Sequence, residues 1–384
     1  MTLVFMLIGA IIVYSLLQRF YRKNWHKGLE ADIRFAVGHA VAGDTIDFVE
    51  VVTNRKRLPL PYVHLKFQMD RALVFEDSGD NAQISDKVYR NDIFSLLMYQ
   101  RVTRKIPVHC TKRGVYSVNG MEIVSSGMFM DEVMVLRTGA NTELIVYPKA
   151  VDTHMLNVAF TKIMGTIEKN KMLYEDPFVF RGIRDYTPMD TMNRINWKAS
   201  ARTGDLMVNQ FNETICQEVC ILLDVETEGM LKRDELSEIS ISIAAGLSQM
   251  LIENGVAVSM ICNGLDYVSE ECVITESASG LAHTKTINTA LARINLNAEP
   301  VDYKWLIANH PELAQDYDND GKKYAGKEPK LYVMIAQNKR VDLQEAFDRL
   351  TGGDSNCLWI IPATKEDSTE LTHCNAQRVV WEVK

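Results

Sequence analysis

Hydrophobic and polar residues follow three successive patterns along this chain of 384 residues, and the first pattern is an unbroken apolar run. Residues 2–17 read TLVFMLIGAIIVYSLL and include no charged side chain. About 17 helical residues at a rise of about 1.5 Å span roughly 26 Å, which is enough to cross the hydrocarbon core of a bilayer with help from flanking residues. The pattern predicts a transmembrane anchor over residues 1–20.

The residues after the apolar run predict how the anchor is oriented. Four of them are basic, namely Arg19, Arg22, Lys23 and Lys27. Under the positive-inside rule this single span leaves the rest of the chain in the cytoplasm, with Tyr21 and Trp25 expected at the membrane interface. A secretory signal would need positive charge before the run and a small-residue cleavage site after it, and the sequence has neither. A buried N-terminal helix is the alternative, although no polar face interrupts the run.

The second pattern, over residues 28–150, has a period of two. Segments such as TIDFVEVVTN, YVHLKFQM and ELIVYP alternate apolar and polar residues, and Asn, Gly and Pro separate them. Short strands at this spacing predict an antiparallel, immunoglobulin-like β-sandwich. No set of side chains here resembles a catalytic site, and His64 and His109 are interpreted as structural or exposed.

The third pattern alternates buried strands with helices over residues 216–384. VCILLD, VAVSMIC, LYVMIA and CLWIIP are continuous apolar runs, as expected for strands covered on both faces, and RVVWEV is a last strand. Between the first two runs, Asp234 opens a helix whose apolar residues step by three and four and which ends at Asn254 and Gly255. Further helices are expected near residues 284–294 and in VDLQEAFDRL. The order predicts an open, mostly parallel, Rossmann-like α/β sheet.

An acidic loop follows the first strand of this sheet. Its sequence LLDVETEG places Asp224, Glu226 and Glu228 at alternate positions. Because alternate residues of an extended segment point to one side, the three carboxylates could share a hard cation such as Mg²⁺ or Ca²⁺. Without a cation they would repel one another. A solvated loop that binds no metal is the alternative interpretation, and we favour it.

Residues 151–215 are assigned to a linker and a basic segment, RGIRDYTPMDTMNRINWKASARTGDLMVNQF. Pro188 and Asp190 suit the start of a short helix, in which Asp190 and Arg194 would pair at i, i+4. Trp197 and Ala201 would share one helix face, which we expect to pack on the domain. The basic face would be formed by Arg194, Lys198 and Arg202.

Composition excludes several classes of protein. The formal net charge of -8 argues against a general nucleic-acid binder. The seven cysteines are odd in number and form no C-x-x-C pair, so neither a zinc site nor a disulfide framework is expected. The sequence also lacks the glycine-rich loops that hold nucleotides and dinucleotides.

The basic segment and its surroundings resemble the bacterial domain-of-unknown-function-58 family. The resemblance rests on Arg184, Tyr186, Asp190, Arg194, Ile195, Asn196, Trp197, Ser200, Ala201 and Arg202, followed by LMVNQF. It extends over most of the chain, because the family combines a membrane segment, a β-sandwich with an R-G-x-Y turn (here from Arg113), this signature and a von Willebrand factor A-like domain. The resemblance implies a partner of the MoxR-type AAA+ ATPases, and no catalytic activity is established for the family.

The sequence departs from the family pattern at two places. Met189 stands where the signature has a glycine before Asp190, so a turn that requires positive φ is not expected there. The metal-ion-dependent adhesion motif of true A domains is D-x-S-x-S, and here Glu226 and Glu228 occupy the serine positions. The motif is therefore interpreted as degenerate.

Three roles are open for the signature. Its arginines can pair with carboxylates and brace the segment on the α/β sheet, its basic face can dock a partner, or it can take part in catalysis. Arginine, tryptophan and asparagine supply no nucleophile and no base near neutral pH, so catalysis is the least expected role. We expect Trp197 and Arg194 to be structural and Lys198 to be exposed.

These observations favour a membrane-anchored, non-catalytic scaffold whose cytoplasmic A-like domain binds a protein partner. The alternative is a divalent-metal-dependent hydrolase that uses the Asp224 carboxylate cluster, although no histidine stands close to it in the sequence. A Cys-His-Asp acyl-transfer enzyme is a third hypothesis, and it is disfavoured because the cysteines lie within strand-like runs.

Overall fold

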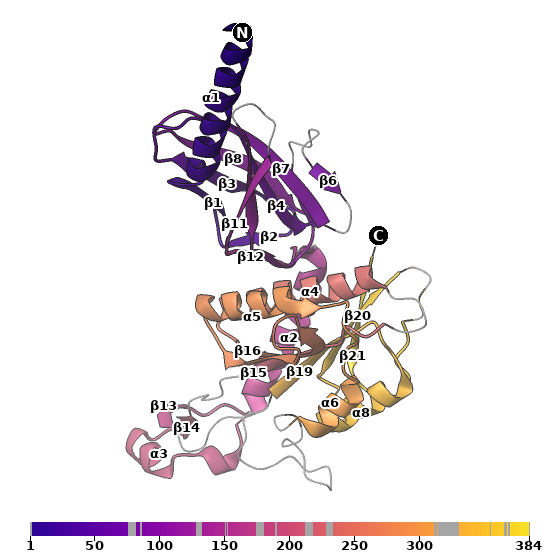
Figure 1. The fold of residues 1–384 in the computed structure, drawn as a ribbon. Coiled ribbons are helices and arrows are strands. Elements are labelled where there is room, and N and C mark those ends of the chain that lie inside the picture. The colour runs from indigo at the N-terminus through magenta and orange to yellow at the C-terminus, as the bar shows by residue number, and fades with distance from the viewer. Residues whose placement is uncertain are drawn as a thin grey trace. The chain divides into compact units, whose positions relative to one another are not determined.

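The computed structural model describes residues 2–75, 82–84, 87–127, 133–149, 151, 153–173, 180–188, 190–211, 218–227, 233–310, 313, 330–353, 355–364, 367 and 369–383. The chain divides into two compact units, Met1–Lys149 and Ala150–Lys384. Each unit has its own hydrophobic core, and the two are described separately (Figure 1).

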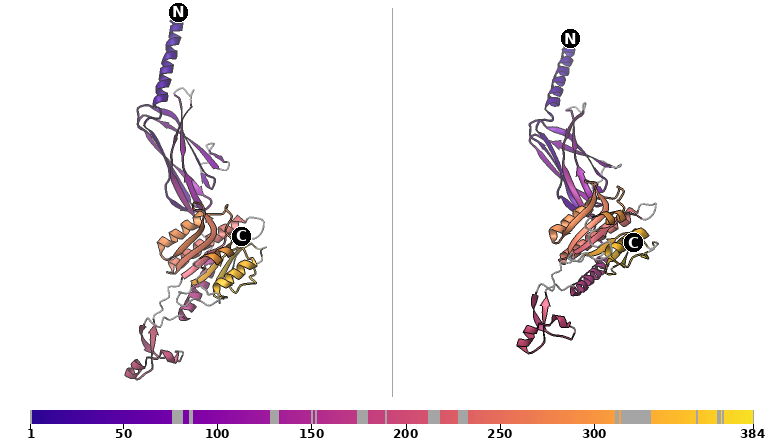
Figure 2. Two further views of the ribbon diagram at one scale, coloured as in Figure 1. Left: turned by 60° about the horizontal axis from the view of Figure 1, so that its bottom comes forward. Right: turned by 90° about the horizontal axis from the view of Figure 1, so that it is seen from below.

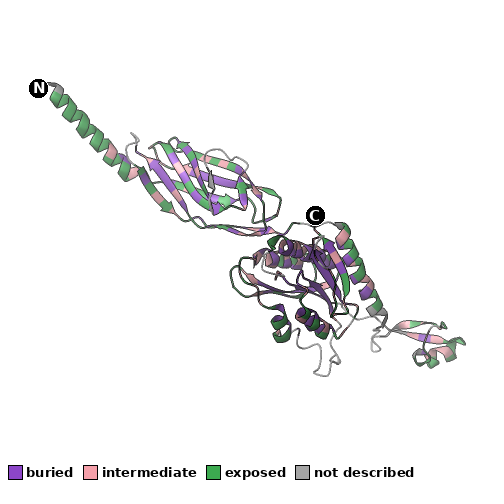
Figure 3. Ribbon diagram, turned by 90° about the vertical axis from the view of Figure 1, so that its right-hand side faces the viewer, coloured by how far each residue is buried: buried purple, intermediate pink, exposed green. Residues whose placement is uncertain are grey.

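Helix α1 (Thr2–Asn24) opens the first unit, and the described part from Val4 to Asn24 is long and apolar enough to cross a membrane. Its apolar side chains are exposed along most of its length (Figure 3). The predicted apolar N-terminal helix is therefore confirmed, whereas the crossing and its orientation stay predictions. Tyr21 and Trp25 do not serve as the exposed anchors that were expected, because both side chains are buried in the core of the following β-domain.

The rest of the first unit consists of strands in three sheets. The strands are β1 (Leu29–Phe35), β2 (His39–Val41), β3 (Thr45–Asn54), β4 (Leu60–Asp70), β5 (Leu73–Phe75), β6 (Ala82–Ile84), β7 (Lys87–Leu96), β8 (Arg101–Cys110), β9 (Gly114–Val118), β10 (Met121–Ser126), β11 (Val133–Thr138) and β12 (Thr142–Tyr147). The sheet orders are β1-β3-β8-β5, β11-β10-β4-β7-β6 and β2-β12-β9. All pairs are antiparallel except β2 with β12.

The two larger sheets pack face to face around one core. Phe48 on β3 contacts Phe67 on β4, with ring centroids 5.2 Å apart. The R-G-x-Y turn closes the other side of this core, where the Tyr116 hydroxyl donates to the Lys112 carbonyl at 2.9 Å. A Cβ at Gly114 would lie 3.1 Å from that hydroxyl, and its φ of +154° also favours glycine. The sequence pattern therefore correctly predicted an antiparallel β-domain.

Three charged side chains are buried in this sandwich and a fourth is partly exposed beside them, and sequence reasoning missed this cluster. Arg90 and Asp92 of β7 are buried and paired, with Arg90 Nε 2.7 Å from Asp92 Oδ2. Arg104 of β8 also contacts Asp92, at 3.1 Å. Glu50 is buried and is the register partner of Arg104. Burial, with the nearby Asp92 charge, raises the pKa of Glu50 above its usual range.

The second unit is built on a doubly covered sheet. Its strands are β15 (Glu218–Leu223), β16 (Ala257–Asp266), β17 (Cys272–Ala278), β18 (Ile294–Asn295), β19 (Lys330–Ile335), β20 (Leu358–Ala363) and β21 (Gln377–Glu382). The order is β17-β16-β15-β19-β20-β21, with β18 paired to β16. The five strands from β16 to β21 are parallel, and β17 is antiparallel to β16. The predicted mostly parallel α/β sheet is thus observed.

Helices cover both faces of this sheet. The helices α2 (Thr153–Leu173), α4 (Asp234–Glu253) and α5 (Leu281–Arg293) pack on one face, and α6 (Tyr303–Asn309) and α8 (Val341–Thr351) pack on the other (Figures 1 and 2). The predicted limits of α4 are correct, since Asp234 begins the helix and Asn254 caps its end. Helix α2 lies in the range that was assigned to a linker. It packs closely on α4, where a Cβ at Gly246 would approach Leu156 to 2.7 Å.

The remaining described elements form a hairpin with one helix. They are β13 (Phe180–Asp185), the 3₁₀ helix η1 (Met192–Arg194), α3 (Trp197–Thr203) and β14 (Met207–Phe211), and they contain the basic segment. Strands β13 and β14 pair antiparallel. Met189 lies outside the described residues, as does Glu228.

Candidate functional site

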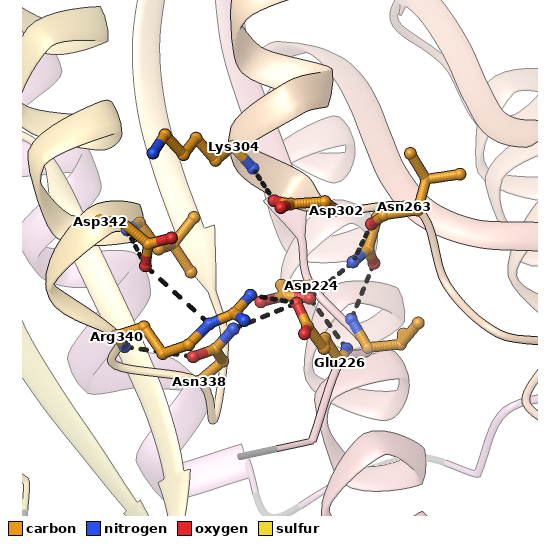
Figure 4. Close-up of polar contacts among 11 residues, drawn as sticks. Asp224, Glu226, Asn263, Asp302, Lys304, Asn338, Arg340 and Asp342 are labelled. Atoms are coloured by element: carbon orange, nitrogen blue, oxygen red, sulfur yellow. Dashed lines mark hydrogen bonds and ion pairs between the residues drawn. The ribbon is translucent and has the colours of Figure 1, made fainter. Parts of the chain in front are cut away.

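Polar side chains gather at the carboxyl ends of three neighbouring strands of the α/β sheet, which is where ligands of such sheets bind (Figure 4). Asp224 follows β15, Asn263 lies near the end of β16, and Asn338 and Arg340 follow β19. The strand order β16-β15-β19 makes these three ends adjacent. We call these four residues and Glu226 the strand-end cluster.

Asp224 is fully buried at the centre of the strand-end cluster. Its Oδ1 accepts hydrogen bonds from Asn263 Nδ2 at 2.7 Å and from the Glu226 backbone N–H at 2.8 Å. Its Oδ2 is buried and has no hydrogen-bond partner among the described residues. Burial raises the pKa of the Asp224 carboxyl to about 7, although the hydrogen bonds from Glu226 and Asn263 oppose the shift. Asp224 thus ties the loop after β15 to strand β16, and its carboxyl keeps a proton to a higher pH than an exposed aspartate does.

Glu226 is half-buried and faces the guanidinium of Arg340, which follows β19. Arg340 Nη2 lies 2.7 Å from Glu226 Oε2, and Asn338 Nδ2 donates to the same oxygen at 3.3 Å. The backbone N–H of Arg340 in turn donates to Asn338 Oδ1 at 3.1 Å. Burial raises the pKa of Glu226, and the Arg340 guanidinium acts in the opposite direction.

This arrangement does not suit Asp224 and Glu226 as two ligands of one cation. The positive charge that a metal would bring to Glu226 is already supplied by Arg340, and a divalent cation at the same carboxylate would be repelled by the guanidinium. Across the described residues, no group of three or more His, Cys, Asp or Glu side chains could hold a metal ion. Glu228, the third predicted ligand, lies outside the described residues.

A cavity of about 290 Å³ lies beside the strand-end cluster. Glu226, Thr227, Ser237 and Pro300 are among the residues that line it. Its floor is held by hydrogen bonds, since Ser237 Oγ donates to the Val225 carbonyl at 3.2 Å and accepts from Gln337 Nε2 at 3.0 Å.

The signature segment forms a second candidate site, and its fold is fixed by polar side chains. Asn196 caps α3, because its Oδ1 accepts from the Ala199 backbone N–H at 2.9 Å. Its Nδ2 donates to Asn209 Oδ1 at 2.7 Å, which ties the start of the helix to β14. Ser200 makes a second tie, since its Oγ accepts from the Met207 backbone N–H at 2.8 Å. Two signature positions are thereby explained as structural.

Arg184 and Asp190 form the ion pair of the signature. Arg184 Nη1 donates to Asp190 Oδ2 at 2.7 Å, and Nη2 donates to Oδ1 at 2.5 Å. The prediction that Asp190 pairs with Arg194 on one helix is wrong, because α3 begins only at Trp197. Chain reversal at the end of β13 brings Asp190 back to Arg184 instead. The side chain of Arg194 lies outside the described residues, so its predicted structural role is untested. Tyr186 is half-buried, and its backbone N–H donates to the Leu206 carbonyl at 2.9 Å.

The prediction that Trp197 is a buried brace is wrong. Its side chain is 66% exposed, and α3 contains no buried residue. The buried apolar residues of this segment are Ile195 and Val208, and Trp197 is not one of them. The basic residues Lys198 and Arg202 are also exposed, one helical turn apart on α3. The expected exposure of Lys198 is confirmed.

Among the described cysteines, no thiol is activated at either site. Cys220 and Cys262 are buried on β15 and β16, as expected from their apolar surroundings. Burial raises the pKa of Cys110 to about 11, and it also raises the pKa of Cys272 and Cys374. A raised pKa lowers the fraction of reactive thiolate, which disfavours a cysteine nucleophile at these positions.

Comparison with known proteins supports the family that the signature indicates. Residues 182–316 match the family model described as "Protein of unknown function DUF58", which begins in β13 and extends beyond α6. No curated protein matches the chain.

Some solved structures are similar to part of the chain, at low identity. They include the CARDB domain of a Pyrococcus furiosus protein (12% identity, 31% of this chain and 90% of that chain, TM-score 0.21) and a cohesin from Archaeoglobus fulgidus (13% identity, 30% and 91%, TM-score 0.21). The macrocyclization catalyst AvmM of alchivemycin A biosynthesis gives 14% identity over 33% of this chain and 94% of that chain, with a TM-score of 0.24. At these TM-scores the likenesses carry no conclusion about fold or function.

Proposed function

We propose that this chain, which carries the DUF58 family segment over residues 182–316, is a membrane-anchored, non-catalytic scaffold that binds a protein partner through that segment. In this proposal α1 crosses the membrane once, the two large units are cytoplasmic, and the α/β domain is of the von Willebrand factor A type. The partner is a MoxR-type AAA+ ATPase.

One observation carries the proposal: Trp197 is 66% exposed in a segment that is held together by other residues. An exposed tryptophan adds no stability to the segment, yet tryptophan and arginine are the side chains that most often dominate binding energies at interfaces. Lys198 and Arg202 are exposed on the neighbouring side of the same short helix, and they favour a partner that presents an acidic surface next to an apolar pocket. We call Trp197, Lys198 and Arg202 the α3 face.

The strand-end cluster supports a structural role within this scaffold. Asp224 and Arg340 connect the loop after β15 to strand β16 and to the loop after β19, and the Arg340 guanidinium supplies a positive charge beside Glu226. The metal-dependent hydrolase alternative needs an open cation site. The guanidinium on Glu226 disfavours it.

A binding titration with matched variants tests the proposed α3 face. The full-length chain in lipid nanodiscs is titrated with the purified MoxR-type ATPase of the same organism. Trp197→Ala and Lys198→Ala are compared with Trp305→Ala and Lys304→Ala, a neighbouring exposed Trp and Lys on another seven-residue helix. We expect Trp197→Ala to weaken binding about tenfold or more, which corresponds to a loss of at least about 1.4 kcal/mol.

The control variants and the melting temperature decide the outcome. Trp305→Ala and Lys304→Ala should bind like the wild type, and none of the four variants should melt more than a few degrees lower, because surface substitutions usually change stability by less than about 0.5 kcal/mol. No binding by the wild-type chain would refute the ATPase as partner. Equal loss in all four variants would refute the α3 face.

A further inference from the structure

Three consecutive large apolar side chains are exposed in the loop between β7 and β8. Leu97, Met98 and Tyr99 are 65%, 59% and 64% exposed. A run of exposed apolar residues is costly in a soluble domain unless it contacts another surface. This loop therefore needs a physical explanation that the α3 face does not provide.

The loop has a defined conformation. The buried side chain of Asn54 donates to the Leu97 carbonyl at 2.8 Å and to the Leu58 carbonyl at 2.9 Å. The Leu97 backbone N–H donates to Gln100 Oε1 at 2.7 Å. Tyr99 has a φ of +53°, a conformation that costs free energy in a residue other than glycine. These contacts hold the three apolar side chains outward.

The strand register places this loop at the end of the sandwich that adjoins the C-terminal end of α1. Leu29, five residues after α1, pairs with Asn54 at the end of β3, and Thr53 pairs with Arg101 at the start of β8. Figure 2 shows α1 leaving one end of the sandwich. The loop before Arg101 is therefore beside the exit of the helix.

Hydrogen bonds connect α1 and the loop through Lys56. The Lys56 ammonium donates to the carbonyls of Trp25 and Lys27, the latter at 2.8 Å. Its backbone carbonyl accepts from the Tyr99 N–H at 3.1 Å. Because Trp25 is buried in the sandwich core, the helix end cannot move independently of this loop.

The surroundings of the loop are mostly basic. Arg57 and Arg101 are exposed on either side of it, and Lys27 is exposed at the helix end. Arg55 is also exposed, and its charge is balanced by Glu30, whose Oε2 lies 2.9 Å from Arg55 Nη2. Apolar side chains surrounded by cations are typical of surfaces that contact anionic lipid headgroups.

The position of the helix fixes the depth at which this loop would lie. Arg19, the first basic residue after the apolar run, precedes Trp25 by six residues, which is about 9 Å of helical rise. The headgroup layer of one leaflet is roughly 5–7 Å thick. A loop hydrogen-bonded to the backbone at residues 25–27 thus lies a few ångströms beyond that layer when α1 spans the core, a gap that its exposed Leu, Met and Tyr side chains can bridge.

We propose that Leu97, Met98 and Tyr99 insert into the interfacial layer of an anionic membrane, with Arg57, Arg101 and Lys27 on the headgroups. This lipid-contact loop is a second membrane contact in addition to α1. It holds the sandwich against the bilayer surface, so that the sandwich is not attached through α1 alone. The inference rests on the proposed membrane anchor.

Depth measurements on the full-length chain test the inference. Nitroxide labels are placed by Met98→Cys, by Ile8→Cys within α1, and by Val74→Cys as the exposed control. Val74 pairs with His109, so it lies near the far end of β8, about 27 Å from Arg101 at about 3.4 Å per residue. The chain is reconstituted in phosphatidylcholine vesicles with and without about 30% phosphatidylglycerol, the anionic component. The wild-type chain, labelled in parallel, gives the background of its own cysteines.

We expect the label at residue 98 to be shielded from a water-soluble nickel chelate in the anionic vesicles, several-fold more than the label at residue 74. Adding Arg57→Glu and Arg101→Glu should reduce the shielding. If residue 98 is as accessible as residue 74 in both vesicles, the lipid-contact loop is refuted. If residue 8 is also accessible to the chelate, the anchor itself fails, which separates the two proposals.

Discussion

Arg184 and Asp190 are joined by two hydrogen bonds, of 2.7 and 2.5 Å, although they are six positions apart in the sequence and no helix aligns them. The same carboxylate accepts from the Thr187 backbone N–H and hydroxyl, each at 2.8 Å. One carboxylate therefore closes the turn after β13 from both sides. The hydrogen bonds from Arg184 hold the pKa of Asp190 well below its usual range.

Asp190→Asn should loosen the signature hairpin. The substitution removes the charge that pairs with Arg184 and leaves one oxygen to accept four donors. We expect faster amide hydrogen exchange over β13 and β14 at pH 7, by about tenfold, because the turn that joins them opens more often. Asp185→Asn, an exposed position on the same strand, is the control and should exchange like the wild type. Equal protection in both variants would contradict the bracing role.

Truncation of Trp359 should lower the unfolding free energy strongly, whereas truncation of Trp197 should hardly change it. Trp359 is 0% exposed on β20, and Trp359→Ala should cost on the order of 3–5 kcal/mol of unfolding free energy. Trp197→Ala should change the unfolding free energy by less than about 0.5 kcal/mol, since its side chain is exposed. Urea unfolding of the detergent-solubilised chain measures both. A large loss for Trp197→Ala would restore the brace interpretation.

Asp224 should make the α/β domain less stable as the pH rises. The folded pKa of about 7 is above the unfolded value of about 3.9, so the folded state binds the proton more tightly. Stability from this group is fully present below about pH 4 and is lost as the pH rises through about 7.

Asp224→Asn tests this pH dependence, because the amide keeps the oxygen that accepts from Asn263 and Glu226. Between pH 5 and 8 the wild type should lose on the order of 1 kcal/mol or more relative to this variant, since one unit of pKa shift corresponds to about 1.4 kcal/mol. Urea unfolding at the two pH values gives the difference. Asp234→Asn, an exposed carboxylate, should keep the wild-type slope. Parallel curves for wild type and Asp224→Asn would exclude the raised pKa.

Arg90 in the sandwich should matter more than a surface arginine. Arg90→Met leaves Asp92 buried with less compensation, which should cost roughly 3–5 kcal/mol. Arg137 pairs with Glu122 at 2.8 Å but is 84% exposed, so Arg137→Met should cost less than about 1 kcal/mol. Amide hydrogen exchange over the strands of the first unit measures the loss of stability in both variants. Similar costs would mean that the cluster is open to water.

Magnesium should have little effect on thermal stability. A cation that bound the strand-end cluster would stabilise the fold in proportion to RT ln(1 + [L]/Kd). Because Arg340 already pairs with Glu226, we expect millimolar Mg²⁺ to leave the melting temperature nearly unchanged. An upward shift that disappears in Asp224→Ala would reinstate the metal site.

The elements that the sequence predicted are those with a strong local period. Helix α4 repeats apolar residues every three or four positions between Asp234 and the Asn254–Gly255 end, and all of this information is local. Helix α2 has a weaker version of the signal, with Leu156, Ala159 and Ile163 on its buried side. That spacing could have revealed the helix within the range assigned to a linker.

The pairings that the sequence did not predict depend on chain reversal or on register. The i, i+4 rule favoured Arg194 for Asp190, and only the turn after β13 makes Arg184 the partner. Glu50 and Arg104 meet because β3 and β8 are in register, which no local pattern specifies. Asn263 carried a usable signal, since it directly follows the buried run VAVSMIC at the same edge of the sheet as Asp224.

The ends of the signature hairpin are register partners, Phe180 with Phe211. Opposite Cα atoms in an antiparallel pair are only about 4.5–5.5 Å apart, so the first and last residues of this segment lie side by side. Because the two ends of the segment lie side by side, we expect that a short glycine linker can replace it without changing the order of strands in the α/β sheet. The sequence and length of the signature segment can therefore change without a matching change in the α/β domain.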